Sequence, residues 1–253
     1  MASPEDGCLR LLQAESEAGS GLIVGIYRRR NADHVLRLVE PAAAAGWRTA
    51  WWGLDGSESS LAELTVGEGP GLKLPLLNET LRRAGEPSAW TVVSDDDLVF
   101  RRGNVVALVE SCTRGRLDLA QPARARGTER SHGITAAVRF SRMRATTFVE
   151  SGPLVAIGPH CRDRVLPFPE ERGMGWGVEI DWFDLAAAGC TLGVVDEIVI
   201  EHLGERGAHY DETEIRARLV EELEARGHPL WAGMRNTVAV WRPWQRTPPW
   251  ARA

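Results

Sequence analysis

The chain has 253 residues, of which 43% are hydrophobic and 26% charged, and a formal net charge of −5. These values are typical of a globular protein with a self-sustaining core, and they exclude a disordered or fibrous chain. The acidic balance argues against nucleic acid as a partner. No run approaches the roughly 18 apolar residues of a membrane span, and the first 19 residues lack the order of a signal peptide, so we expect a cytoplasmic protein.

Strands and helices alternate through the first half of the chain. Short runs of β-branched or aromatic residues, bounded by turn residues, predict strands at 21–27, 48–54 and 90–94. Capping and periodicity signals predict helices at 32–45, 76–84 and 104–113, and the glycines and proline of 67–71 indicate a loop. This alternation predicts an α/β fold with a Rossmann-like, mostly parallel central sheet flanked by helices.

The second half is less regular. Apolar runs predict strands at 133–140, 146–157 and 192–200, and helices are expected at 177–188 and 215–226, the latter opened by Asp211. No linker separates domains, so we expect a single domain. Its parts are a first half at about 20–115, a second half at 116–230 and a tail rich in Trp and Pro at 231–253.

Three consecutive aspartates, Asp95, Asp96 and Asp97, follow the third predicted strand. Ligands of open α/β sheets bind at the carboxyl ends of the strands. In an extended segment Asp95 and Asp97 face one way and Asp96 the other. Two carboxylates side by side favour a hard cation, Mg²⁺ or Mn²⁺, shared with a substrate phosphate. The alternative is a solvated acidic turn that caps the next helix.

Lys73 is the only lysine among 30 basic residues. Its presence among so many arginines indicates either chance or a site that needs a compact point charge.

A strand that ends in Asp-x-Asp within a nucleotide-binding half-sheet resembles the A-type glycosyltransferase fold, GT-A. The resemblance implies a metal-dependent enzyme that moves a sugar from a nucleotide-diphosphate sugar, with a UDP-sugar preferred, to an acceptor. Residues 20–115 would then bind the nucleotide sugar, and 116–230 the acceptor. The donor contacts that it implies are Asp55, Lys73, Asn78, Asp95 and Asp96.

Further stretches resemble the DUF707 group of glycosyltransferase-like proteins, in order over roughly residues 88–205. Where that group tends to carry an aspartate, this chain has Glu179. The matching stretches are Asp95-Asp96-Asp97-Leu98, Gln121-Pro122, Ser131-His132, Ile134-Thr135, Gly175-Trp176-Gly177, Gly193-Val194-Val195-Asp196 and His202.

These resemblances imply a site for Mn²⁺ or Mg²⁺ made of Asp95, Asp97 and His202. If the enzyme inverts the sugar's configuration, a carboxylate must take the acceptor's proton. Asp181 is the expected base, with Glu179 as acceptor ligand.

Two further residues are expected to contact the acceptor. Trp176 is interpreted as stacking on a sugar ring, with core packing as the alternative. His132 is interpreted as an acceptor contact, with a structural hydrogen bond as the alternative.

Two other functions stay open at this point. The same acids would serve a nucleotidyl or phosphoryl transferase, and a degenerate transferase fold would serve as a carbohydrate-binding protein without catalysis. The acceptor could be a natural product, a saccharide or a lipid, and the sequence is compatible with an oligomer.

Overall fold

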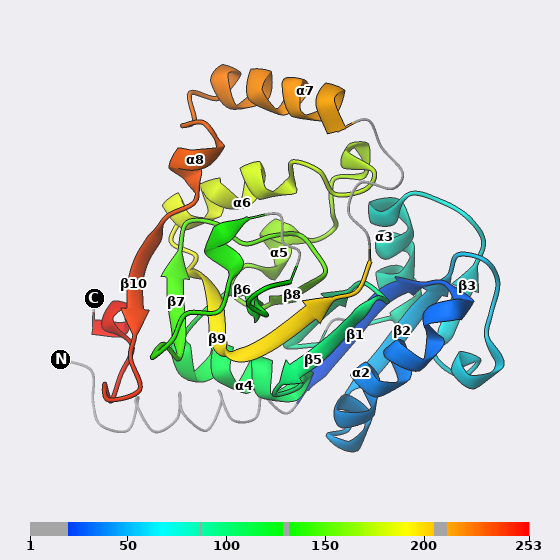
Figure 1. Cartoon of the computed structure of the whole chain (residues 1–253). Helices are drawn as coiled ribbons and strands as arrows, with labels where there is room; N and C mark the ends of the chain where they lie inside the picture. The colour runs from blue at the N-terminus through cyan, green and yellow to red at the C-terminus, as the bar shows by residue number, and fades with distance from the viewer. Residues whose placement is uncertain (1–19, 87, 129–131, 205–211, 253) are drawn as a thin grey trace.

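The computed structural model describes residues 20–86, 88–128, 132–204 and 212–252, which form a ten-stranded sheet with helices on both faces (Figure 1). Ser131 and Asp211, both used in the sequence analysis, lie outside these residues. The strands are β1 (Gly21–Tyr27), β2 (Arg48–Gly53), β3 (Thr65–Glu68), β4 (Trp90–Ser94), β5 (Leu98–Arg102), β6 (Leu119–Arg124), β7 (Met143–Thr146), β8 (Leu154–Ile157), β9 (Leu192–His202) and β10 (Thr237–Trp241). The helices are α2 (Ala32–Ala44), α3 (Lys73–Ala84), α4 (Val105–Gly115), α5 (Arg162–Val165), α6 (Val178–Ala187), α7 (Glu212–Ala225) and α8 (Trp231–Met234).

The sheet has the order β10-β7-β9-β6-β8-β4-β1-β2-β3, and β5 pairs with β9 outside this path. The strands β5, β7 and β8 run against all the others, so the sheet is mostly parallel in direction. One core lies between the sheet and helices α2 and α4, and a second lies between the opposite face and α3, α5 and α6. This is the mixed α/β architecture that the sequence predicts.

Strand β1 lies at the centre of the parallel part and is buried at every residue. Two of its glycines admit indole rings from the segment around β2. A Cβ atom would lie 2.3 Å from the ring of Trp47 if placed on Gly21, and 2.2 Å from the ring of Trp51 if placed on Gly25. The apolar run and its glycines therefore fix β1 between β2 and β4, with its carboxyl end beside the carboxyl ends of both.

Most predicted elements of the first half are confirmed. Strands β1 and β4 have the predicted bounds, and α2 and α4 agree to within two residues at each end. Helix α3 begins at Lys73, three residues before its predicted start, and residues predicted as a loop contribute to β3. Strand β3 is short and only partly buried, so it lacks the apolar run that predicts a strand.

The second half departs further from the prediction. The strand expected at 133–140 is wrong: Gly133–Thr135 form a 3₁₀ turn. The Arg144 guanidinium donates to the carbonyl groups of Ile134 and Ala136, and Ala136 makes an isolated bridge to Arg124 of β6 in place of a strand. The strand expected at 146–157 is two strands, β7 and β8, separated by residues 147–153.

Strands β5 and β6 are not predicted at all. Strand β6 carries Gln121 and Pro122, and a proline in a run argues against a strand.

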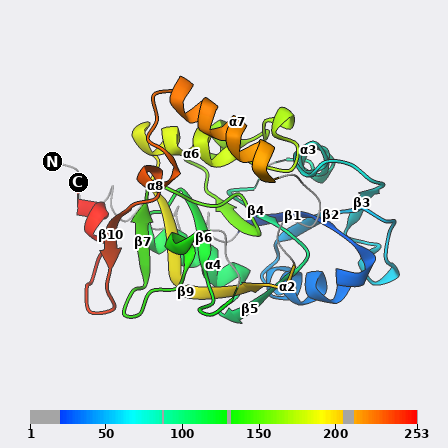
Figure 2. The same cartoon turned by 45° about the horizontal axis from the view of Figure 1, so that its top comes forward.

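Helix α7 lies on the far side of α6 from the sheet (Figures 1 and 2). A small apolar cluster joins α6, α7 and α8, with Trp176 packed against it: Ile180, Leu219, Leu223 and Met234. Among the described residues, no helix has both the length and the apolar character that crossing a bilayer requires.

Candidate functional site

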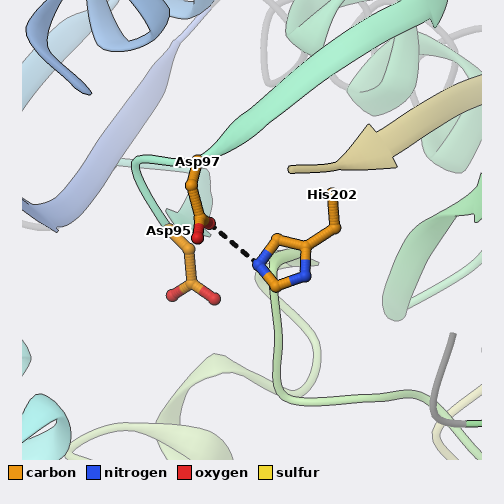
Figure 3. Close-up of side chains that lie close together, drawn as sticks. All are labelled: Asp95, Asp97 and His202. Carbon is orange, nitrogen blue, oxygen red and sulfur yellow. Dashed lines mark ion pairs between the residues drawn. The ribbon is translucent and has the colours of Figure 1, made fainter. Parts of the chain in front are cut away.

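Two carboxylates and an imidazole meet at the carboxyl-end edge of the sheet (Figure 3). Asp95 and Asp97 follow β4, and His202 ends β9. One potential ligand atom from each lies within 4.8 Å of the others. The antiparallel pairing of β5 with β9 causes this approach, because it sets Leu98 opposite His202 and lets the Leu203 N–H donate to the Asp97 carbonyl (2.7 Å). The residues expected to hold the metal are therefore close together.

Asp97 lies closest to the histidine. Its Oδ1 atom is buried, and His202 Nε2 lies 2.8 Å away. This approach lacks the alignment of a hydrogen bond, and Oδ1 has no other hydrogen-bond donor in the described part of the chain. Burial raises the pKa of Asp97, whereas His202 and the charge of Lys73 lower it. The lowering is the larger effect, so the pKa of Asp97 lies below its ordinary value. Asp97 thus offers an ionised carboxylate with one buried oxygen atom, which could bind a cation.

Lys73 faces the other outer carboxylate. Its Nζ lies 2.5 Å from Asp95 Oδ1, and Lys73 is the first residue of α3. Gly152 lies over this pair, since a Cβ atom there would be 3.0 Å from Asp95 Oδ2 and 3.2 Å from Lys73 Nζ. The only lysine of the chain therefore contacts the predicted metal site.

Asp96 points the other way, as the alternation of an extended segment predicts. Its Oδ2 accepts hydrogen bonds from the Arg28 backbone N–H (2.6 Å) and the Asn31 side chain (3.0 Å). Burial raises its pKa, although these two donors oppose the shift. Asp55, which follows β2, accepts a hydrogen bond from the backbone N–H of Arg29 (2.9 Å), the residue after Arg28. Both aspartates thus hold the turn that follows β1.

The donor set fits a divalent cation. Carboxylate oxygens suit Mg²⁺ and Mn²⁺, and imidazole is a common ligand of transition metals. The fit rests on the chain's own geometry, because the buried Asp97 Oδ1 lacks a hydrogen bond. Gly204 adds a space restriction, since a Cβ atom there would lie 2.1 Å from Asp97 Oδ2. Any side chain at position 204 would therefore displace the Asp97 carboxylate from its present position.

Glu179, in the first turn of α6, is connected to the same site. Its Oε1 accepts from both the backbone N–H (3.0 Å) and the hydroxyl (2.7 Å) of Ser151. Ser151 precedes Gly152, which lies over Asp95 and Lys73. The second carboxylate oxygen of Glu179, Oε2, has no hydrogen-bond donor within the part of the chain that the structure describes.

Asp181 lies elsewhere. It forms ion pairs with Arg172 (3.2 Å) and Arg226 (2.8 Å), on the side of α6 that faces α7. Two positions on a helix separated by two residues point roughly 200° apart. Glu179 and Asp181 therefore point to different sites, although both are expected to act on the same acceptor. The role of Asp181 as base stays a prediction, and its ion pairs argue against it.

Three further predicted residues have structural contacts of their own. Asn78 donates to the Phe168 carbonyl (2.9 Å) and accepts from its N–H (2.8 Å), so its amide group fixes a loop, and its expected contact with the donor stays a prediction. Trp176 packs against the cluster between α6 and α7, which is the core-packing alternative. His132 contacts Arg235 and the Phe148 ring.

Sequence reasoning missed the segment between β7 and β8. Glu150 lies beside Gln121, Ser151 binds Glu179, and Gly152 covers Asp95. The signal was present, because Ser-Gly-Pro at 151–153 interrupts the apolar run that was interpreted as one strand.

No protein-family model matches the chain, and no curated protein matches it in sequence. The resemblance to the DUF707 group is therefore not confirmed. Solved structures are similar in fold. GalNAc-T7 with UDP, GalNAc and Mn²⁺ is 10% identical, with a TM-score of 0.55 over 80% of this chain and 48% of that chain. Residues 1–349 of S. aureus TarS with UDP-GlcNAc are 12% identical, with a TM-score of 0.51 over 81% of this chain and 66% of that chain.

The chain thus spans about half the length of the first of these proteins and about two thirds of the second. At such identities the likeness concerns the fold alone. The fold is that of the GT-A glycosyltransferases, as the sequence predicts.

Proposed function

We propose that the protein is a metal-dependent glycosyltransferase that moves a sugar from a nucleotide-diphosphate sugar to an acceptor. The observation that carries the proposal is the grouping of Asp95, Asp97 and His202 at the carboxyl-end edge of a GT-A sheet. A UDP-sugar is the proposed donor, because the similar structures named above hold UDP or UDP-GlcNAc. Mn²⁺ or Mg²⁺ is the proposed cation.

In this proposal the first half of the chain binds the donor. Asp95, Asp97 and His202 would hold the cation, which supplies Lewis-acid stabilisation of the leaving diphosphate. Lys73 would place a positive charge beside that diphosphate, since its ammonium group already lies against Asp95. Asp55 and Asp96 support the turn after β1, where the nucleoside would bind.

We propose Glu179, and not Asp181, as the base of an inverting transfer. Both carboxylates stand at the start of α6, but only Glu179 is connected to the donor site, through Ser151. Ser151 orients Oε1 and leaves Oε2 to accept the proton of the acceptor hydroxyl as the glycosidic bond to the diphosphate breaks. Asp181 keeps a structural role, because Arg172 and Arg226 hold its oxygens.

A thermal-shift panel of UDP, GDP, CDP and TDP, each with and without Mn²⁺, tests the donor site. A ligand of the folded state stabilises it by about 2.7 kcal/mol at a hundredfold excess over Kd. We expect UDP to raise the Tm of the wild-type protein only with Mn²⁺. Asp97→Ala should lose this shift, and Asp33→Ala, an exposed acid in α2, should keep it. An unchanged shift in Asp97→Ala would refute the metal site.

Release of free sugar from UDP-sugars separates catalysis from binding. Even without the natural acceptor, a glycosyltransferase should slowly transfer the sugar of its donor to water and release UDP. The Asp97→Ala variant should not release sugar. The protein could instead bind nucleotide but release no sugar from any of a panel of UDP-sugars with candidate acceptors. That result would contradict the proposed enzymatic activity and favour a carbohydrate-binding protein.

A further inference from the structure

Phe140 and Trp244 are large aromatic residues whose side chains the fold leaves in solvent. Each is 71% exposed, and Trp244 is the only exposed tryptophan among those whose side chains the structure describes. Phe140 lies just before β7 and Trp244 just after β10, and these two strands pair with each other. Their loops therefore extend from the same end of the strand pair (Figures 1 and 2). Residues 139–142 and 242–246 together form what we call the aromatic surface.

Hydrogen bonds between the two loops fix the backbone of the aromatic surface. Arg242 Nη1 donates to the Phe140 carbonyl (3.1 Å), and Arg142 Nη2 donates to the Pro243 carbonyl (3.3 Å). Within the second loop, the side-chain oxygen of Gln245 accepts from the Arg242 backbone N–H (2.6 Å). The two exposed rings are thus carried by hydrogen-bonded turns and not by loose ends of the chain.

The backbone of Phe140 has an unfavourable conformation for its residue type. Its φ is +56°, in the left-handed region that bulky side chains rarely adopt and that is found most often at functional positions. Glycine would adopt this φ without strain. Because the ring is exposed, packing within the chain does not explain why phenylalanine stands at this position. The strain and the exposure together indicate that the ring makes its contact outside the chain.

The aromatic surface is positively charged, although the whole chain has a net charge of −5. Its two loops contain four arginines and no acidic residue. Arg142 pairs with Glu197 (3.5 Å), whereas the other three have no acidic partner in the described part of the chain. These three are Arg139, Arg242 and Arg246. The surface therefore presents positive charge around two apolar rings, and this combination restricts the partners that it fits.

We propose that the aromatic surface binds a lipid bilayer that carries anionic headgroups. Tryptophan and phenylalanine bury their rings at the boundary between headgroups and acyl chains, and arginines beside them attract anionic lipids. The long arginine side chains keep their charge at the level of the phosphates while the rings enter the bilayer. This interaction is additional to the proposed glycosyltransferase function and does not rest on it.

Two other partners fit the aromatic surface less well. Single-stranded nucleic acid binds where stacking rings line a basic groove, but these two loops extend beyond the end of the strands (Figures 1 and 2). A second copy of the chain, joined here around a two-fold axis, would set the same arginines against one another, and like charges repel. A bilayer accepts both the rings and the charge without either difficulty.

Co-sedimentation of the full chain with lipid vesicles tests the proposal. We expect the protein to bind vesicles of equimolar phosphatidylglycerol and phosphatidylcholine, and to bind pure phosphatidylcholine more weakly. Binding to the anionic vesicles should weaken as the salt concentration rises, because salt screens the attraction between the arginines and the headgroups. Absence of binding to the anionic vesicles would refute the proposal.

Substitutions on the aromatic surface separate the rings from the charges. Trp244→Ala should weaken binding to the anionic vesicles about tenfold, because the ring is no longer buried in the bilayer. Leu230→Ala, at a leucine that is 56% exposed before α8, is the matched apolar control. Arg139→Gln and Arg246→Gln should each weaken binding about fivefold, and Arg37→Gln, at an exposed arginine of α2, should not. Equal binding by wild type and Trp244→Ala would refute the proposal.

Phe140→Gly distinguishes a role in binding from a role in the fold. Glycine relieves the backbone strain, so the Tm should stay the same or rise while vesicle binding falls severalfold. A purely structural role for Phe140 predicts the opposite result, a lower Tm with unchanged vesicle binding, and would overturn its part in the surface.

Two measurements on the same samples detect the other partners. Sedimentation velocity would show a dimer that Trp244→Ala dissociates if the surface joined two copies of the chain. Fluorescence anisotropy with a labelled oligouridine would show binding if the partner were nucleic acid. Either result, obtained without binding to anionic vesicles, would overturn the proposal. The Tm shift with UDP and Mn²⁺ should be the same in Trp244→Ala as in wild type, so the test of the bilayer contact is independent of the test of the donor site.

Discussion

The two halves of the sheet are held together in different ways. Strands β3, β2, β1 and β4 are all parallel, and their core is formed by apolar side chains and indole rings. The other half mixes directions and buries charge. Among the described residues, four of the five buried charged side chains lie there, as the pairs Arg124–Glu150 and Arg144–Asp196. The first half is thus specified by local hydrophobic pattern, and the second by ion pairs between distant residues.

If the halves also divide the chemistry, a change of the base should leave donor binding intact. Glu179→Gln should lower turnover by about 10²- to 10⁴-fold, because the acceptor proton loses its base. The Tm shift with UDP and Mn²⁺ should not change. Steady-state assays and the thermal shift, run on the same protein, measure the two effects.

Asp181→Asn is the matched control for this experiment. Its carboxylate serves ion pairs on the side of α6 that faces α7, so turnover should stay within a few-fold of wild type. A large loss of turnover in Asp181→Asn, with Glu179→Gln active, would restore the base that the sequence analysis expects.

The buried ion pair that joins Arg144 of β7 to Asp196 of β9 should dominate the stability of the second half. Arg144 donates to both Asp196 oxygens (2.9 and 3.0 Å), and Asp196 is fully buried. Arg144→Met leaves the buried Asp196 carboxylate without its counter-charge and should lower the free energy of unfolding by about 3–5 kcal/mol. Urea denaturation measures the change. Arg142→Met, at a half-exposed arginine on the same segment, should cost about 1 kcal/mol or less.

The first half should instead be sensitive to added volume. A methyl group on Gly25 would meet the Trp51 ring at 2.2 Å and the Ser94 carbonyl oxygen at 2.6 Å. Gly25→Ala should therefore destabilise the protein by about 1–3 kcal/mol. Gly133→Ala, where a Cβ atom has open space, should have little effect in the same denaturation assay. Equal stabilities of the two variants would show that the apolar half tolerates overpacking.

The smallest expected effect is a pH dependence at the α6–α7 contact. Hydrogen bonds from Arg172 lower the pKa of Glu222, with Arg226 adding to the shift. A lowered folded pKa stabilises the protein above the unfolded value, about 4.3, and this stabilisation is lost as the pH falls through the folded pKa. The Tm difference between wild type and Glu222→Gln should therefore shrink below about pH 4. Glu221→Gln, at an exposed neighbour, should show no such trend.

Sequence reasoning succeeds where a local pattern is sufficient. Strands β1 and β4 follow from short apolar runs, and the common direction of Asp95 and Asp97 follows from alternation along an extended segment. These features depend on residues a few positions apart, so no tertiary information is needed.

Prediction from the sequence fails where contacts with distant residues determine the local structure. The segment after His132 makes one isolated bridge to β6 and no strand, with Arg144 bound to its carbonyl groups. Asp181 cannot be told from Glu179 in the sequence, because the partners Arg172, Arg226 and Ser151 are known only from the fold. Strand β6 is hidden by its proline and glutamine.

Three adjacent residues between β7 and β8 each contact a different group: Glu150 lies against Arg124, Ser151 against Glu179, and Gly152 over Asp95. Successive Cα atoms are about 3.8 Å apart, so the backbone alone sets the separation of these contacts. An inserted or deleted residue there would displace all three together, whereas side-chain replacements could alter each separately. Among chains that share this arrangement, the length of the segment should consequently vary less than its composition.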